Sequence, residues 1–253
     1  LLPMEPSDAS TPGYQLGEQI RANFLIPRGV ASTRIYEEDY GVSPEITPCD
    51  ISNVRAAWSS GRFGVNTWWT HGSETYAADI FSSYDATYLN DAYPSFTFQN
   101  SCTNGAPEWS NNLGYALLAN GAIGTVSASR VSWYWVGQSD FTGTPLSNSM
   151  MAYAYTGALM YDTLPAGKAL NQVRRAMDID ASWNAMNMVD FNLYGDPSLG
   201  ITTSAPAQTV PTGLQATAGI RRVGLSWNAY AGALKYYIKR SVVGGALAII
   251  DST

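Results

Sequence analysis

The single histidine of this 253-residue chain and one of its two cysteines each follow a short apolar run. His71 comes shortly after the run at residues 63–69 (FGVNTWW), and Cys102 comes shortly after the run at 94–99 (PSFTFQ). A cysteine thiol becomes an effective nucleophile when a nearby imidazole can take its proton, and such pairs carry out acyl transfer. The residue types therefore predict nucleophilic catalysis by Cys102 with His71.

The two apolar runs explain how residues so far apart in the sequence could meet. Both are short, rich in aromatic and β-branched residues, and end in small or polar ones, which is typical of buried strands. Ligands of an α/β sheet bind beyond the carboxyl ends of its strands. If the runs form neighbouring parallel strands, they deliver the imidazole and the thiol to one edge.

The rest of residues 1–201 alternates between helical and strand patterns, which predicts a mostly parallel α/β sheet flanked by helices. Asp50 is expected to cap a helix that ends at Gly61. Further strands are predicted at residues 1–4, 32–37, 122–127 and 189–194, and helices at 15–25, 51–60, 111–120, 149–163 and 167–177, with a short helix at 77–81.

The pattern changes after a linker predicted at residues 202–210. Short alternating runs at 213–218, 223–227 and 236–240 indicate the start of a β-sandwich. Residues 211–253 resemble part of a fibronectin type III domain, in which this segment would supply about three of the strands. No chemistry is expected from it.

The composition argues against a nucleic-acid-binding protein and against a transmembrane helix. Only 13% of the residues are charged, the net charge is −6 and the pI is near 4.7, so a basic surface for nucleic acid is absent. No apolar run is long enough to predict a transmembrane helix. The chain begins without a signal peptide or an initiator methionine, and we expect it to be a fragment of a secreted or cell-surface protein. Two cysteines allow at most one disulfide, between Cys49 and Cys102.

Four blocks, in order along residues 1–201, resemble the gingipain-type cysteine peptidases, family C25 of the caspase-like clan. They are THGSET at residues 70–75, SCTNG at 101–105, GTV and AS at 124–129 leading to Trp133, and YGDPSL at 194–199. The resemblance implies a caspase-like fold over residues 1–201, with the N-terminal part of the domain missing. It also implies a cysteine endopeptidase that acts on proteins or peptides.

The resemblance assigns a role to each matched residue. Cys102 would be the nucleophile, and His71 would transfer protons and protonate the leaving amine. The backbone N–H groups of Gly72 and Cys102 would form the oxyanion hole. Glu5 would orient the imidazole as a third catalytic residue.

The predicted substrate pocket combines Trp133 with Tyr14 or Gln15. Trp133 matches an aromatic residue of the family's P1 pocket, while Tyr14 or Gln15 stands where the arginine-specific members have an acidic residue. Asp8 and Asp79 are substitute carboxylates for that position. Because a buried cation needs a partner of opposite charge, we do not expect strict selection of Arg or Lys.

Simpler structural roles stay open beside these. Glu5 can be a solvated loop carboxylate, Asp196 can serve only the turn that it occupies, and residues 133–135 can be packing rather than a substrate wall. Two functional alternatives also remain, namely a sortase-like transpeptidase at the bacterial surface and a catalytically degenerate surface adhesion or scaffold protein. We expect no cofactor or catalytic metal, although calcium could act as a structural ion in such a domain.

Overall fold

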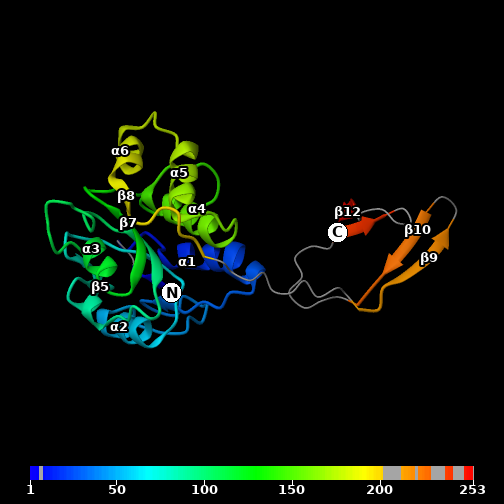
Figure 1. Ribbon diagram of the computed structural model, residues 1–253, viewed down its shortest axis with the longest axis horizontal. Coiled ribbons are helices and arrows are strands. Elements are labelled where there is room, and N and C mark those ends of the chain that lie inside the picture. The colour runs from blue at the N-terminus through cyan, green and yellow to red at the C-terminus, as the bar shows by residue number, and fades with distance from the viewer. Residues whose placement is uncertain (6–7, 202–211, 220–221, 229–236, 242–247, 253) are drawn as a thin grey trace. The chain divides into compact units, whose positions relative to one another are not determined.

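The structure is a computed structural model that describes residues 1–5, 8–201, 212–219, 222–228, 237–241 and 248–252. The chain divides into two compact units, residues 1–203 and 204–253 (Figure 1). The linker predicted at residues 202–210 lies wholly outside the described residues, so the predicted boundaries stay a prediction.

A six-stranded sheet with the order β2-β1-β3-β6-β7-β8 forms the centre of the first unit (Figure 1). The neighbouring pairs from β2 to β7 are parallel, and β8 runs antiparallel to β7. This confirms the predicted mixed α/β fold with a mostly parallel sheet. The strands are β1 (Leu2–Met4), β2 (Arg34–Tyr36), β3 (Val65–Trp69), β6 (Ser95–Asn100), β7 (Ala122–Ala128) and β8 (Phe191–Gly195).

Helices cover both faces of this sheet, and each face has its own apolar core. One core joins β3 and β6 to α1, α4 and α5 through residues such as Leu16, Phe98 and Tyr155, and the other joins the sheet to α2 and α3 through Trp58 and Leu117. Every residue of β3 and β6 is buried, as expected for parallel strands covered on both sides. The helices are α1 (Tyr14–Ile20), α2 (Ile51–Ser60), α3 (Leu113–Leu118), α4 (Asn148–Met160), α5 (Ala166–Ala176) and α6 (Ser182–Asp190).

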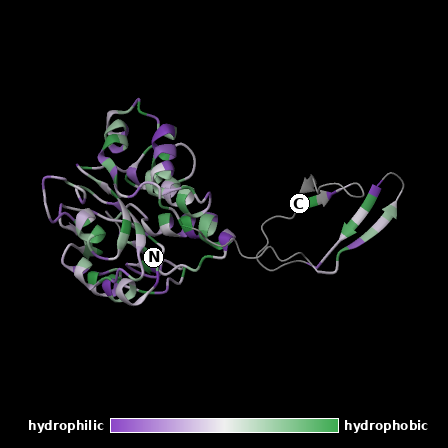
Figure 2. Cartoon of the chain, viewed as in Figure 1, coloured by the Kyte–Doolittle hydropathy of each residue, from purple (hydrophilic) through white to green (hydrophobic). Residues whose placement is uncertain are grey.

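Side-chain caps mark the start of α2, α3 and α4. Asp50 accepts a hydrogen bond from the Asn53 amide at 2.8 Å at the start of α2, as predicted from the sequence. Ser147 caps α4 in the same way through the Met150 amide at 3.2 Å. Figure 2 shows apolar residues along the central strands and hydrophilic residues mainly on the outer helices and loops.

Two segments differ from the sequence prediction. The short helix expected at residues 77–81 is wrong, since a hairpin of β4 (Tyr76–Ala77) and β5 (Phe81–Ser82) lies there instead. Asp79 turns the chain with a φ of 55°, and Phe81 is buried in the second core. Helix α6 was not predicted, because its buried residues include Asn184 and Asn187 and its apolar residues face outward.

The remaining short elements of the first unit are a π-helical turn at Arg21–Leu25 and 3₁₀ turns at Ile26–Arg28 and Asp85–Tyr88. Among the described residues, no helix is long and apolar enough to cross a membrane.

The second unit contains two antiparallel strand pairs among its described residues. Strand β9 (Gln215–Gly219) pairs with β10 (Arg222–Ser226), and β11 (Tyr237–Arg240) pairs with β12 (Ala248–Ser252). Strands were predicted at or near β9, β10 and β11, while β12 was not. The fibronectin type III assignment stays a prediction, since these pairs form two separate two-stranded sheets.

Candidate active site

The register of three neighbouring strands brings the predicted catalytic residues to one edge of the sheet. Met4 of β1 pairs with Trp69 of β3, and Trp69 pairs with Asn100 of β6. The ladder continues past the strand ends, because the Glu5 amide donates to the Trp69 carbonyl at 3.0 Å and the Thr70 amide donates to the Asn100 carbonyl at 3.1 Å. Glu5, His71 and Cys102 therefore follow three adjacent strand ends.

Gly72 lies against the backbone of the predicted nucleophile. A Cβ atom at Gly72 would come within 2.7 Å of the Cys102 carbonyl oxygen and 2.8 Å of Ser101 Cβ, so no larger residue fits without displacing the chain. The loop that carries His71 is held from its other side, where the His71 carbonyl accepts from the Ala78 amide at 2.8 Å. Close packing thus holds the His71–Gly72 loop against Cys102.

The Cys102 thiol is half-buried and touches one residue of the long loop after β7. Its Sγ accepts from the Ser132 amide at 3.4 Å and lies 3.6 Å from the Ser132 carbonyl oxygen. The Ser132 hydroxyl in turn accepts from the Asn148 side-chain amide at 2.9 Å, at the first turn of α4. These contacts fix the position of the sulfur, and both cysteines are free thiols, which excludes the Cys49–Cys102 disulfide.

Glu5 lies beside the same edge in an environment that disfavours its charge. One carboxylate oxygen, Oε2, is buried without a hydrogen-bond partner. Burial first, and then repulsion from Glu37 and Asp79, raises the pKa of Glu5 to about 7. A carboxyl group whose pKa is shifted by burial and by neighbouring charges is a candidate functional residue.

Asn104 joins the two catalytic loops, and sequence reasoning did not single it out as a site residue. Its side chain is fully buried, accepts from the Ser101 hydroxyl and donates to the Tyr76 carbonyl at 2.9 Å and to the Ser73 carbonyl. Ser101 precedes Cys102, and Ser73 follows Gly72. The only available signal was its place in the block SCTNG, because the contacts span about thirty residues of sequence.

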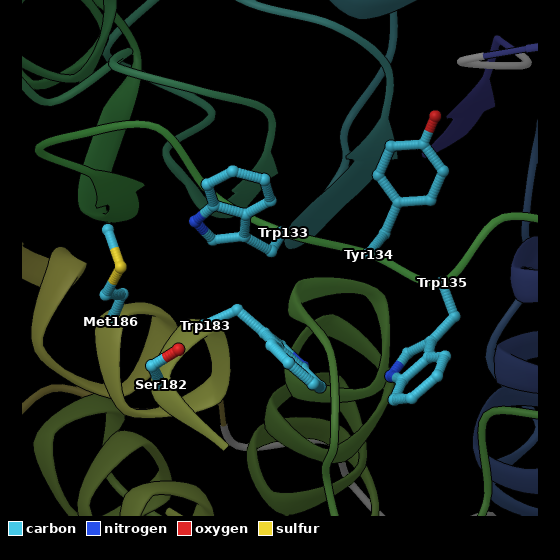
Figure 3. A pocket seen from close by; sticks show the side chains of 6 residues that line it. All are labelled: Trp133, Tyr134, Trp135, Ser182, Trp183 and Met186. Carbon is cyan, nitrogen blue, oxygen red and sulfur yellow. The ribbon is translucent and has the colours of Figure 1, made fainter.

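Trp133 lines a pocket next to the thiol contact at Ser132 (Figure 3). The Asn187 side chain of α6 accepts from the Trp133 amide and donates to the Trp133 carbonyl, both at 2.8 Å. The Trp133 carbonyl also accepts from the Asn148 amide at 2.9 Å. The pocket has a volume of about 280 Å³, and its lining consists of Trp133, Tyr134, Trp135, Ser182, Trp183 and Met186.

The structure places the other predicted pocket residues elsewhere. Tyr14 begins α1 and stacks on Tyr40 with ring centroids 4.4 Å apart, and Gln15 donates to the Tyr14 hydroxyl at 3.4 Å. Neither residue is part of the lining around Trp133. Asp79 is exposed in the turn of the β4–β5 hairpin.

Asp8 reaches the pocket loop, but its carboxylate is already engaged. One oxygen accepts from Thr11 and from the Tyr134 hydroxyl at 2.7 and 2.8 Å, and the other accepts from the Ser10 amide and hydroxyl at 2.9 and 2.8 Å. Mainly because of the hydrogen bond from Thr11, with help from Tyr134 and Ser10, the pKa of Asp8 falls to about 2. The carboxylate is thus an acceptor for this loop rather than an open partner for a substrate cation.

A metal centre finds no support in the described part of the chain, where no group of three or more His, Cys, Asp or Glu side chains could hold an ion.

Comparisons with known proteins identify the family and support the fold. The model of peptidase family C25 matches residues 7–202. The chain is also similar to the crystal structure of the Arg-specific cysteine proteinase gingipain R (RgpB), with a TM-score of 0.59 and 20% identity over 90% of this chain and 53% of that chain. A complex of the Porphyromonas gingivalis RgpB pro- and mature domains gives a TM-score of 0.60 and 19% identity over 90% of this chain and 54% of that chain.

The chain thus spans about half the length of the structures that it matches, and their low identity supports the fold alone. No curated protein matches it. The family match covers most of the chain, including all the strands of the six-stranded sheet except β1. The chain therefore belongs to peptidase family C25.

Proposed function

We propose that this chain is the catalytic part of a cysteine endopeptidase, with Cys102 as the nucleophile and His71 as the acid and base. The observation that carries the proposal is the paired register of β3 and β6, which places His71 and Cys102 just beyond Trp69 and Asn100. A second observation supports the proposal. Gly72 packs on the Cys102 backbone, so backbone groups lie close to the nucleophile.

The reaction uses these groups in two steps. His71 takes the proton of the Cys102 thiol, and the sulfur attacks the substrate carbonyl carbon, so that a C–S bond forms as the carbonyl π-electrons move to oxygen. When the C–N bond breaks, His71 gives a proton to the leaving amine. Water then attacks the thioester, His71 takes a proton from it, and the carboxylic acid and the thiol are released.

The oxyanion of both steps would accept hydrogen bonds from the backbone amides of Gly72 and Cys102. Among the described residues, neither amide donates to another protein group, so both are available to a substrate oxygen. Donors held where charge develops supply much of the rate enhancement in acyl transfer. Glu5 directly follows the neighbouring strand β1, and the proposal assigns it to orienting the His71 imidazole.

The proposal extends to the substrate and to the location of the protein. The substrates are proteins or peptides, and the proposed location is outside the cell or at its surface, in keeping with the low charged fraction of 13%. Arg or Lys specificity is not part of the proposal, since the Asp8 carboxylate is engaged by four hydrogen-bond donors and no residue that lines the pocket at Trp133 is charged.

Hydrolysis of a denatured protein by the whole chain tests this function. The wild type and Cys49→Ala should both release peptides with free carboxyl termini, because Cys49 is buried and burial raises the pKa of its thiol. Cys102→Ala should release none. If Cys102→Ala digests the substrate as fast as the wild type, or if added amines are incorporated in place of water as the main products, the hydrolase proposal is wrong.

A further inference from the structure

We propose that the pocket around Trp133 binds one large apolar side chain of the peptide substrate, close to the bond that is cut. This inference rests on the proposed peptidase function and adds a substrate class to it. The pocket, called the tryptophan pocket from here on, is the one lined by Trp133, Tyr134, Trp135, Ser182, Trp183 and Met186.

Helix α6 presents its apolar side chains in the direction opposite to that of an ordinary surface helix. Asn184 and Asn187 are fully buried, while Trp183 and Met186 are 40% and 42% exposed. A helix on a protein surface normally buries its apolar stripe and exposes its polar residues. Gathered exposed apolar side chains of this kind mark binding sites.

The buried asparagines hold this arrangement in place. The Asn187 side chain forms hydrogen bonds with both the backbone amide and the backbone carbonyl of Trp133, and Asn184 donates to the Pro145 carbonyl at 3.2 Å. The Trp135 indole donates to the Leu146 carbonyl at 2.9 Å, and its ring lies edge-on to Trp183 with centroids 5.8 Å apart. The apolar walls are thus built on fixed backbone, which lowers the entropy lost when a ligand binds.

Figure 3 shows how the side chains divide between the two sides of the loop. Trp133, Trp183 and Met186 surround the pocket, whereas the Tyr134 hydroxyl points away, toward the side where it donates to Asp8. Trp133 is still 45% exposed and Trp135 49% exposed, so both rings keep a free face for a ligand.

Along the chain, the pocket begins one residue after a contact of the Cys102 thiol. Ser132, which touches the Cys102 thiol, is the residue directly before Trp133. One residue of extended chain spans about 3.5 Å. In a peptide whose scissile carbonyl lies at the thiol, the neighbouring side chains are therefore only a few ångströms away, a distance similar to the one-residue step from Ser132 to Trp133. The occupant argued from this position is therefore a substrate side chain.

Size and charge define that side chain. The volume of about 280 Å³ lies just below the ~300–1,000 Å³ typical of ligand pockets, which suits a single side chain. No lining residue is charged, and the nearby Asp8 carboxylate is saturated. A Lys or Arg head group would lose its hydration there without gaining a partner, so Phe, Tyr, Trp, Leu or Met is the expected occupant.

Cleavage-site profiling tests the inference on the whole chain. A mixed peptide library is digested and the cut sites are identified by mass spectrometry, with wild type, Trp183→Ala and Val189→Ala compared. Val189 is a matched control, since it is exposed on α6 but does not line the pocket. Wild type and Val189→Ala should share an enrichment of large apolar residues at one position within three residues of the cut.

Trp183→Ala should lower kcat/KM for the enriched peptides about 10-fold and leave peptides without the apolar residue unaffected. Folding is checked by the unfolding midpoint, and Met186→Ala provides a second variant with a smaller expected loss. A fully active chain without apolar enrichment, or with an enrichment that Trp183→Ala and Met186→Ala leave unchanged, overturns the inference but not the proposed function.

Self-association is the rival use of the tryptophan pocket. The inference is also wrong if the wild type is a dimer, Trp183→Ala makes it a monomer, and the cleavage profile stays the same. Complete inactivity of wild type and Val189→Ala would instead contradict the proposed peptidase function, and direct binding of an apolar peptide to Cys102→Ala then decides the pocket separately.

Discussion

At the scale of single residues, Glu5 and Asn104 connect the proposed catalytic pair, His71 and Cys102, to the sheet in different ways. Glu5 continues the hydrogen-bond ladder beside Trp69 and carries a buried oxygen without a partner. Asn104 uses both ends of its amide to join the loops that hold His71 and Cys102. Each makes a prediction about stability that is separate from the chemistry.

Glu5→Gln should stabilise the protein at alkaline pH relative to acidic pH. The pKa of Glu5 is raised from 4.5 to about 7, so the neutral form stabilises the fold below pH 4.5, and this stability is lost as pH rises through 7. Glutamine has no charge to desolvate, so its relative gain above pH 7 is on the order of 1 kcal/mol after allowance for solvent screening. Urea unfolding of both forms at pH 4 and pH 8 measures the difference.

The same carboxylate should support catalysis, so Glu5→Gln is expected to be more stable but slower at pH 8. Glu37→Gln is the control for a nearby charge, since Glu37 is an exposed source of the repulsion on Glu5. An equal stability difference at pH 4 and pH 8 would show that the Glu5 carboxyl is not desolvated in the folded state.

Asn104→Ala should destabilise the fold by about 2 kcal/mol and reduce turnover. The substitution removes the acceptor of the Ser101 hydroxyl proton and one of the two donors to the Tyr76 carbonyl, which keeps the Ser73 amide. Asn120→Ala is the matched control, because the Asn120 amide donates only within the end of α3, to the Ala116 carbonyl at 2.9 Å. Guanidinium unfolding and peptide hydrolysis check both effects, and equal losses in the two variants would argue against a special role for Asn104.

At the scale of elements, α6 and the loop at residues 129–147 form the wall of the site that the sheet alone does not provide. The sheet places the proposed catalytic residues, while α6 holds Trp133 through Asn187. The proposed catalytic pair and the proposed selectivity thus belong to different elements, and they should respond separately to mutation.

Asn187→Ala tests that separation. It removes both hydrogen bonds to the Trp133 backbone in a fully buried position, so we expect a loss of about 1–3 kcal/mol in unfolding free energy. The preference for apolar substrate residues should fall as the loop loosens, while Cys102 stays reactive. Thermal unfolding measures the loss of stability, and cleavage profiling measures the preference for apolar residues, both with Val189→Ala as the control. An unchanged cleavage profile in a destabilised protein would contradict the role assigned to Asn187.

At the scale of the whole molecule, the sheet could be predicted from sequence because its strands are short apolar runs with distinct ends. The positions of His71 and Cys102 followed from that pattern, as did the Asp50 cap of α2. The helix α6 could not be predicted from apolar periodicity, since its inner face is made of asparagines. The hairpin at Tyr76–Ser82 was missed because a two-residue strand leaves almost no pattern.

The partners of the catalytic residues were equally hidden from the sequence. Ser132 touches a thiol thirty residues away, and Asn187 binds Trp133 across fifty-four residues. Such contacts depend on how the elements pack and not on local spacing. The sequence alone raised doubt about an arginine-specific pocket, because Tyr14 or Gln15 replaces the family's acidic residue. Only the structure revealed that the Asp8 carboxylate is already occupied by hydrogen bonds.

Covalent labelling of Cys102 tests the central claim most directly. A peptidyl acyloxymethyl ketone reacts with an activated thiol by forming a C–S bond and losing its carboxylate, and mass spectrometry locates the adduct. We expect labelling at Cys102 in wild type and Cys49→Ala, no labelling in Cys102→Ala, and labelling at least about 100-fold slower in His71→Ala. Labelling at Cys49, or an equal rate in His71→Ala and wild type, would contradict the account.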